Sequence, residues 1–85
     1  MPRNDDLEAL LQAQYDWENA WPQDKAAYQA VFNRLIKHYV RKYNATASAR
    51  RKPEITEAQL REALGRRYYQ FKKARDRELA RKLTT

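Results

Sequence analysis

The sequence contains no cysteine, one glycine and three prolines among its 85 residues. The lack of cysteine excludes disulfide bonds, cysteine-ligated zinc and thiol catalysis. So little glycine and proline argues against a turn-rich sheet protein. No apolar run approaches the roughly 20 residues of a membrane span. The polar, acidic start of the chain also lacks the apolar stretch of a signal peptide, so we expect a cytoplasmic protein.

Residues that carry enzymatic chemistry are scarce as well. His38 is the only histidine, so the sequence supports neither a multi-histidine metal site nor a hydrolase triad. There is no glycine-rich phosphate loop. Tyr68 and Tyr69 follow two arginines, and tyrosine can attack a DNA phosphate, but no histidine cluster accompanies them. We expect a protein that is not an enzyme and uses no cofactor or metal.

What the sequence does contain is helical periodicity. Hydrophobic residues make up 42% of the chain, enough for a folded core. The spacing predicts one domain over 1–85, an all-α three-helix bundle with helices near 5–20, 24–43 and 57–82. The predicted core faces repeat at steps of three and four. They are Leu7, Leu10, Leu11, Gln14, Trp17 and Trp21 in the first helix, Tyr28, Val31, Phe32, Leu35, Ile36, Tyr39 and Tyr43 in the second, and Leu60, Ala63, Leu64, Tyr68, Phe71 and Ala74 in the third.

Local signals mark the ends of these helices. Pro22 disfavours helical geometry at the preceding residue and ends the first helix, and Asp24 is a good cap residue for the second. The short loop between them predicts antiparallel neighbours. Residues 44–55 are small, polar and basic, and we expect a flexible surface connection there. Thr56 and Gln59 fit a capping box at the start of the third helix.

Gly65 allows two interpretations. It could cap a short helix that ends at Leu64, or it could lie within one long helix. The apolar spacing runs unbroken from Leu60 to Phe71, which favours one long, basic helix whose end extends beyond the bundle.

Charge is distributed unevenly along the chain. Residues 1–30 hold two basic and six acidic groups, net −4, whereas residues 31–85 hold 16 basic and five acidic groups, net +11. The total is +7. Positive potential is therefore confined to the second and third helices and their connection.

Some of the charged residues need no binding partner to explain them, because they pair with each other along a helix and stabilise it. Glu57–Arg61, Glu62–Arg66 and Glu78–Lys82 are acid-before-base pairs at i,i+4 that support a solvated helix. The remaining cations lie on strips with few local acids, and a polyanion such as DNA or RNA would bind them with release of counterions. The predicted nucleic-acid-binding residues are Arg34, Lys37, Arg41, Arg50, Arg51, Lys52, Arg66, Tyr69, Gln70, Lys73, Arg77 and Arg81.

A different class of function competes with this one. Leu79 and Leu83 continue the apolar line of the third helix into its extension, as in a subunit that pairs with a second copy or another protein. Binding to an acidic membrane surface is the weaker alternative, because the core needs the apolar face of the third helix.

Residues 55–65, ITEAQLREALG, resemble the first helix and turn of helix-turn-helix repressors and sigma-factor-type domains. In that family a Leu-Gly pair closes the turn. The resemblance implies that residues 66–77 form a recognition helix, with Gln70, Lys73 and Arg77 toward the major groove. The family pattern has a small residue where this chain has Arg61, an apolar residue where it has Arg66, and a capping residue where it has Arg67.

Overall fold

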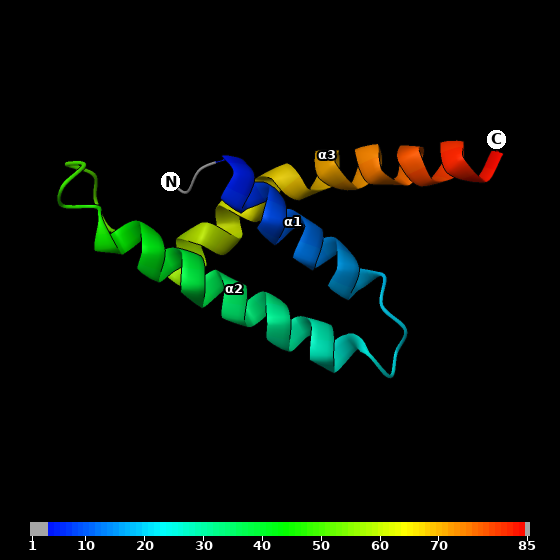
Figure 1. Ribbon diagram of the computed structural model, residues 1–85, viewed down its shortest axis with the longest axis horizontal. Helices are drawn as coiled ribbons and strands as arrows, with labels where there is room; N and C mark the ends of the chain where they lie inside the picture. Colours follow the sequence, from blue (N-terminus) through cyan, green and yellow to red (C-terminus); the bar gives the residue numbers. More distant parts are fainter. Residues whose placement is uncertain (1–3, 85) are drawn as a thin grey trace.

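Three α-helices account for most of the chain: α1 (Asn4–Glu18), α2 (Lys25–Ala45) and α3 (Glu57–Thr84) (Figure 1). The structure is a computed structural model that describes residues 4–84, and these residues contain no β-strand. The prediction of an all-α three-helix bundle is therefore confirmed. Each helix begins and ends within two residues of its predicted limits.

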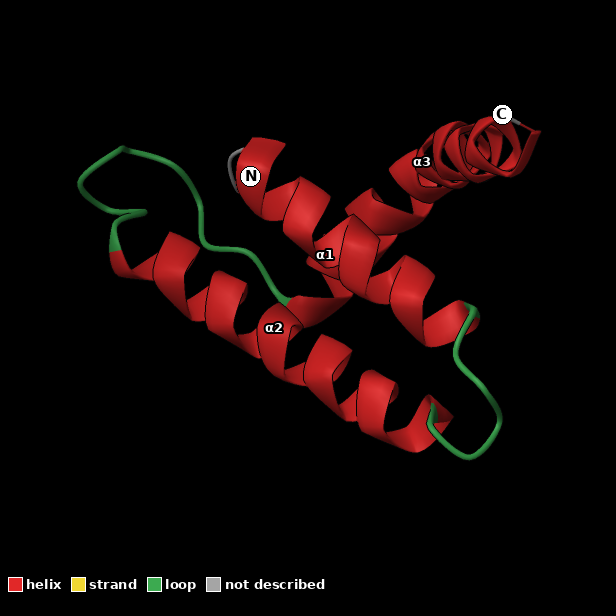
Figure 2. Ribbon diagram, turned by 45° about the vertical axis from the view of Figure 1, so that its right-hand side comes forward, coloured by secondary structure: helices red, strands yellow, loops and turns green. Residues whose placement is uncertain are grey.

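α1 and α2 run antiparallel, as the short loop predicted (Figures 1 and 2). The turn between them is closed by a hydrogen bond of 2.8 Å from the Asp24 N–H to the Trp21 carbonyl. Asp24 stands at the N-cap position of α2, but its side chain makes no capping hydrogen bond. Its backbone is helical (φ −102°, ψ −10°), whereas a capping side chain needs an extended backbone.

The core lies where all three helices meet. Trp17 of α1 covers one edge of it and stacks on Phe32 at 5.7 Å between ring centroids. Helices bury an apolar face because removing a leucine-sized side chain from water contributes about 1.5–3 kcal/mol. The buried cluster consists of Leu7, Leu10, Leu11, Phe32, Ile36, Leu60 and Leu64.

Four residues predicted to face the core are exposed instead. Trp21 is 73% exposed, and Tyr28 and Val31 are 44% and 47% exposed. Every residue from 21 to 31 is exposed, because α1 and α3 do not cover the first two turns of α2. Ala74 is exposed for a similar reason, since it lies where α3 leaves the bundle.

α3 begins at the predicted capping box. The Gln59 N–H donates to Thr56 Oγ1 at 3.1 Å, and the Thr56 N–H donates to Gln59 Oε1 at 2.9 Å. Gly65 lies inside the continuous helix, so the long-helix interpretation is confirmed. The turn implied by the resemblance to helix-turn-helix proteins is absent, and the resemblance is overturned for this chain.

The connection between α2 and α3 is held by its own hydrogen bonds. Asn44 accepts from the Ile55 N–H and donates to the Ile55 carbonyl, both at 2.9 Å. Residues 46–51 form a further turn that ends with Arg51 at φ 54°. The Lys52 N–H donates to the Ala47 carbonyl at 2.9 Å, and Ala47 itself is buried. These bonds fix where the basic residues of the connection lie.

The C-terminal half of α3 extends beyond the other helices, as predicted. Its 28 residues correspond to about 42 Å at 1.5 Å per residue, and the longest dimension of the molecule is 49 Å. All residues from 76 to 84 are exposed. Figure 1 shows this end of α3 projecting from the bundle.

Candidate nucleic-acid interface

All twelve side chains predicted to bind nucleic acid are exposed. They form three groups that are named here by their place in the fold. The α2 strip is Arg34, Lys37 and Arg41; the connection cluster is Arg50, Arg51 and Lys52; and the α3 strip is Arg66, Gln70, Lys73, Arg77 and Arg81, with Tyr69 beside it.

The α2 strip lies on the side of the helix opposite Phe32 and Ile36, so core packing directs these cations to solvent. Lys37 and Arg41 line a depression of about 290 Å³ together with Glu57 at the start of α3. One carboxylate oxygen of Glu57 is buried without a hydrogen-bond partner. This carboxylate is the one negative group that lines the depression, so it lowers the positive potential locally.

The connection cluster contains one arginine that the fold holds in place. The Arg50 guanidinium donates to the Thr46 hydroxyl and lies 5.0 Å from the centroid of the Tyr43 ring. Hydrogen bonding and cation–π attraction together fix its orientation. Arg51 and Lys52 have no ion-pair partner among residues 4–84.

The α3 strip is partly engaged with neighbours on the same helix. Arg66 pairs with Glu62 at 2.8 Å, as the i,i+4 spacing predicted, and both side chains are well exposed. Such a pair is worth at most about 1 kcal/mol and gives way easily to a phosphate. Lys73 lies 5.1 Å from the centroid of the Tyr69 ring. Arg77 has no ion-pair partner among the described residues.

The acids of α1 neutralise little of this charge. Asp6 of α1 pairs with Lys42 at 3.7 Å, and Lys42 is outside the three groups. Within residues 4–84, Arg34, Lys37 and Arg41 have no acidic partner within ion-pair distance. The positive potential predicted from the sequence therefore remains available at the surface.

One of the predicted helix pairs has a different partner in the structure. Arg61 donates to the Asn33 side chain at 2.9 Å and lies over the Phe32 ring, instead of pairing with Glu57. A tertiary partner therefore competes with the i,i+4 partner of Arg61. Glu78 accepts from Arg75 at 3.1 Å.

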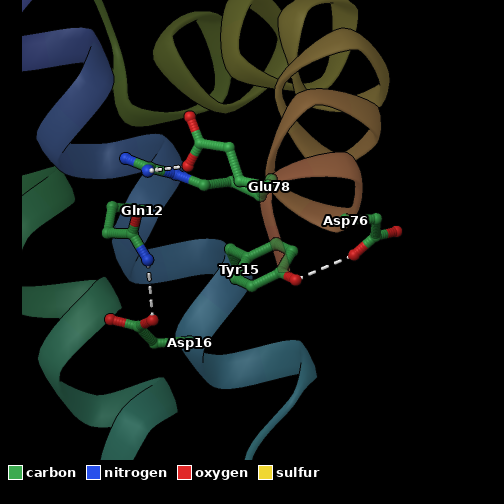
Figure 3. A network of polar contacts seen from close by, with 6 residues as sticks. Gln12, Tyr15, Asp16, Asp76 and Glu78 are labelled. Carbon is green, nitrogen blue, oxygen red and sulfur yellow. Dashed lines mark hydrogen bonds and ion pairs between the residues drawn. The ribbon is translucent and has the colours of Figure 1, made fainter. Parts of the chain in front are cut away.

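Tyr15 ties α3 to α1 at the point where α3 leaves the bundle. Its hydroxyl donates to Asp76 at 2.8 Å (Figure 3). Its ring meets the Phe71 ring edge-on at 6.3 Å between centroids. The hydrogen bond to Asp76, followed by burial, raises the pKa of Tyr15. This contact sets the direction in which the α3 strip projects.

The three groups do not converge on one concave site. α3 starts beside α2, and its C-terminal half runs away from α2 (Figures 1 and 2). The α2 strip and the α3 strip therefore lie on separate helix surfaces. Arg66 lines a second depression, of about 310 Å³, with Glu54 and Glu62. The two depressions that these groups line are open to solvent, as contact with an extended phosphate backbone would require.

Sequence reasoning did not identify the cation–aromatic pairs. Tyr69 and Lys73 are four residues apart on α3, and so are Phe71 and Arg75, whose separation is 5.1 Å. The i,i+4 spacing of an aromatic and a basic residue is the signal that would have found both pairs.

The structure also places the groups considered for catalysis. His38 is exposed and touches the Tyr39 ring. Tyr68 is half-buried, and burial raises the pKa of its hydroxyl, which the nearby Glu18 carboxylate raises further. Within residues 4–84 no three potential metal ligands come together.

Comparisons of the chain with protein-family models, with curated proteins and with solved structures gave no match. Among the helices described, none combines the length and apolar character needed to cross a membrane.

Proposed function

We propose that this protein binds nucleic acid without catalysing a reaction, and that it holds backbone phosphates through the α2 strip, the connection cluster and the α3 strip. The observation that carries the proposal is a set of exposed cations that have no acidic partner within residues 4–84: Arg34, Lys37, Arg41, Arg51, Lys52 and Arg77. Their mutual repulsion gives the fold no benefit, whereas each phosphate they neutralise releases counterions.

The form of the surface favours contacts to the backbone over readout of bases. Arginine and lysine contacts to phosphate position a duplex without reading its sequence. Tyr69 is 63% exposed, and its ring is available for stacking on an unpaired base. Of the predicted residues, Tyr69 and Gln70 are the two that are not cations, so they are the candidates for selectivity.

The test is a titration of labelled duplex DNA, duplex RNA and single-stranded DNA with the purified protein. Anisotropy measured between about 50 and 300 mM NaCl gives the salt dependence, and contact with five phosphates implies a log–log slope of about −4 to −5. Comparing the three probes separates DNA from RNA. Absence of binding to every probe at the lowest salt would refute the proposal.

A second function, a helical interaction subunit, is favoured by the C-terminal end of α3. Leu79 is 49% exposed and Leu83 is 86% exposed. Two leucines on one side of a projecting helix are a typical contact for another helix. The two functions are compatible, since pairing of two copies doubles the basic surface.

A further inference from the structure

Two helix ends are not covered by any other part of residues 4–84. The first is the start of α2, where every residue from 25 to 31 is exposed. The second is the end of α3, where every residue from 76 to 84 is exposed. Both carry large apolar side chains, which bundle helices normally bury. Both also lie at the same end of the molecule, to the right in Figure 1.

The first surface combines aromatic rings with acids. Trp21 is 73% exposed, and the turn fixes its backbone, since its carbonyl accepts from the N–H groups of Asp24 and Lys25 at 2.8 and 3.1 Å. Next to it is a depression of about 350 Å³ whose lining includes Tyr28, Asp24 and Asp16. We call this the acceptor surface: Trp21, Tyr28, Asp16 and Asp24.

The second surface is a line along α3. Lys72, Leu79 and Leu83 are separated by seven and four residues and share one side of the helix. At 100° per residue, Lys73 is about 100° and Arg77 about 140° away from the midline of the two leucines, so they face a different direction. We call the line of Lys72, Leu79 and Leu83 the donor ridge.

Charge selects which surface pairs with which. Residues 14–31 contain three acids and one base, net −2, whereas residues 72–84 contain six bases and two acids, net +4. Two donor ridges brought together would repel each other. A donor ridge against an acceptor surface has opposite charges and apolar side chains on both sides.

We propose that a second copy of this chain covers both surfaces, with the donor ridge of each copy docked on the acceptor surface of the other. The two surfaces lie at one end of the molecule. Two copies related by a two-fold axis at that end therefore make both contacts at once. The α3 strip stays on the outer side of the pair. The proposal is independent of nucleic-acid binding and concerns the protein alone.

Sedimentation of protein freed of nucleic acid tests the pairing. We expect the wild-type chain to pass from monomer to dimer as its concentration rises, with weaker association at high salt. The acceptor variant Trp21→Ala/Tyr28→Ala and the donor variant Leu79→Gln/Leu83→Gln should each weaken association at least about 100-fold. His38→Ala removes an exposed ring of α2 outside both surfaces and should leave association unchanged. Helix content and thermal unfolding confirm that each variant folds.

Mixing the two variants distinguishes reciprocal docking from other modes of pairing. Alone, each variant lacks both contacts of the dimer. In the mixture, the donor ridge of the acceptor variant meets the intact acceptor surface of the donor variant, so a heterodimer with one contact should form. A wild-type chain that stays monomeric up to about 1 mM overturns the proposal. So does an acceptor variant that dimerises like wild type, because its leucines would then pair with each other.

Discussion

Tyr15 and Tyr68 have hydroxyls in opposite circumstances. The Tyr15 hydroxyl donates to Asp76 at 2.8 Å, whereas the Tyr68 hydroxyl oxygen is buried without a hydrogen-bond partner. A hydroxyl that forms a hydrogen bond stabilises the fold modestly. A buried hydroxyl without a partner destabilises it, because it has given up its hydrogen bonds to water. The sequence indicated that Tyr68 faces the core. The partner of Tyr15 is 61 positions away in the sequence, and only the packing of α3 on α1 brings the two together.

We expect removal of these two hydroxyls to change the free energy of unfolding to different extents. Tyr15→Phe should lower the free energy of unfolding by about 1 kcal/mol, because Asp76 loses its donor. Tyr68→Phe should lower it by less than Tyr15→Phe does, because the Tyr68 hydroxyl is near the Glu18 carboxylate but makes no hydrogen bond of normal length. Urea unfolding at neutral pH measures both. Equal losses in the two variants would contradict the assignment of partners.

Tyr15 and Tyr68 also predict how the free energy of unfolding changes at alkaline pH. The pKa of each tyrosine is raised above the usual value of about 10. Above that pH the unfolded chain releases protons that the folded protein keeps, so the free energy of unfolding should fall as pH increases. Each phenylalanine variant should show a shallower fall than wild type. Unfolding measured from pH 8 upward checks the slopes, and a steeper fall in either variant would contradict the sign.

At the scale of helices, local sequence signals predicted the ends well. The capping box at Thr56 and the stop before Pro22 involve only neighbouring residues, so they act wherever the helix packs. Periodicity wrongly assigned three exposed residues to the core: Trp21, Tyr28 and Val31. The error has a physical reason. Periodicity identifies the apolar side of a helix, but whether another helix reaches that side depends on helix lengths and crossing positions.

Gly65 offers a test of α3 as one continuous helix. A Cβ at this position would meet no atom within 4 Å, so Gly65→Ala adds helix propensity without a clash. We expect stabilisation of about 1 kcal/mol. For a domain of this size that corresponds to a rise in Tm of about 4–8 °C. Ala74→Gly, at an exposed position of the same helix, should have the opposite sign. A loss of stability in Gly65→Ala would show that the glycine serves as a turn or hinge.

For the whole molecule, the sequence predicted the composition of the candidate interface but not its shape. Exposure of all twelve residues follows from charge and from helical spacing, since cations are rarely buried without partners. The separation of the α2 strip from the α3 strip follows from how α3 crosses α2, which no local signal encodes. The interface is consequently a set of separate contacts along two diverging helices.

Separate contacts should contribute separately to the salt dependence of nucleic-acid binding. Arg34→Gln/Lys37→Gln/Arg41→Gln should make the log–log slope shallower by about 2 to 3, and Lys73→Gln/Arg77→Gln by about 2, because each phosphate contact accounts for about 0.9. Lys25→Gln removes an equally exposed cation of α2 beside the acidic turn and should leave the slope unchanged. Anisotropy titrations at several salt concentrations measure all three. If Lys25→Gln changes the slope as much per charge as the strip variants do, binding reflects net charge alone, and the strips have no special role.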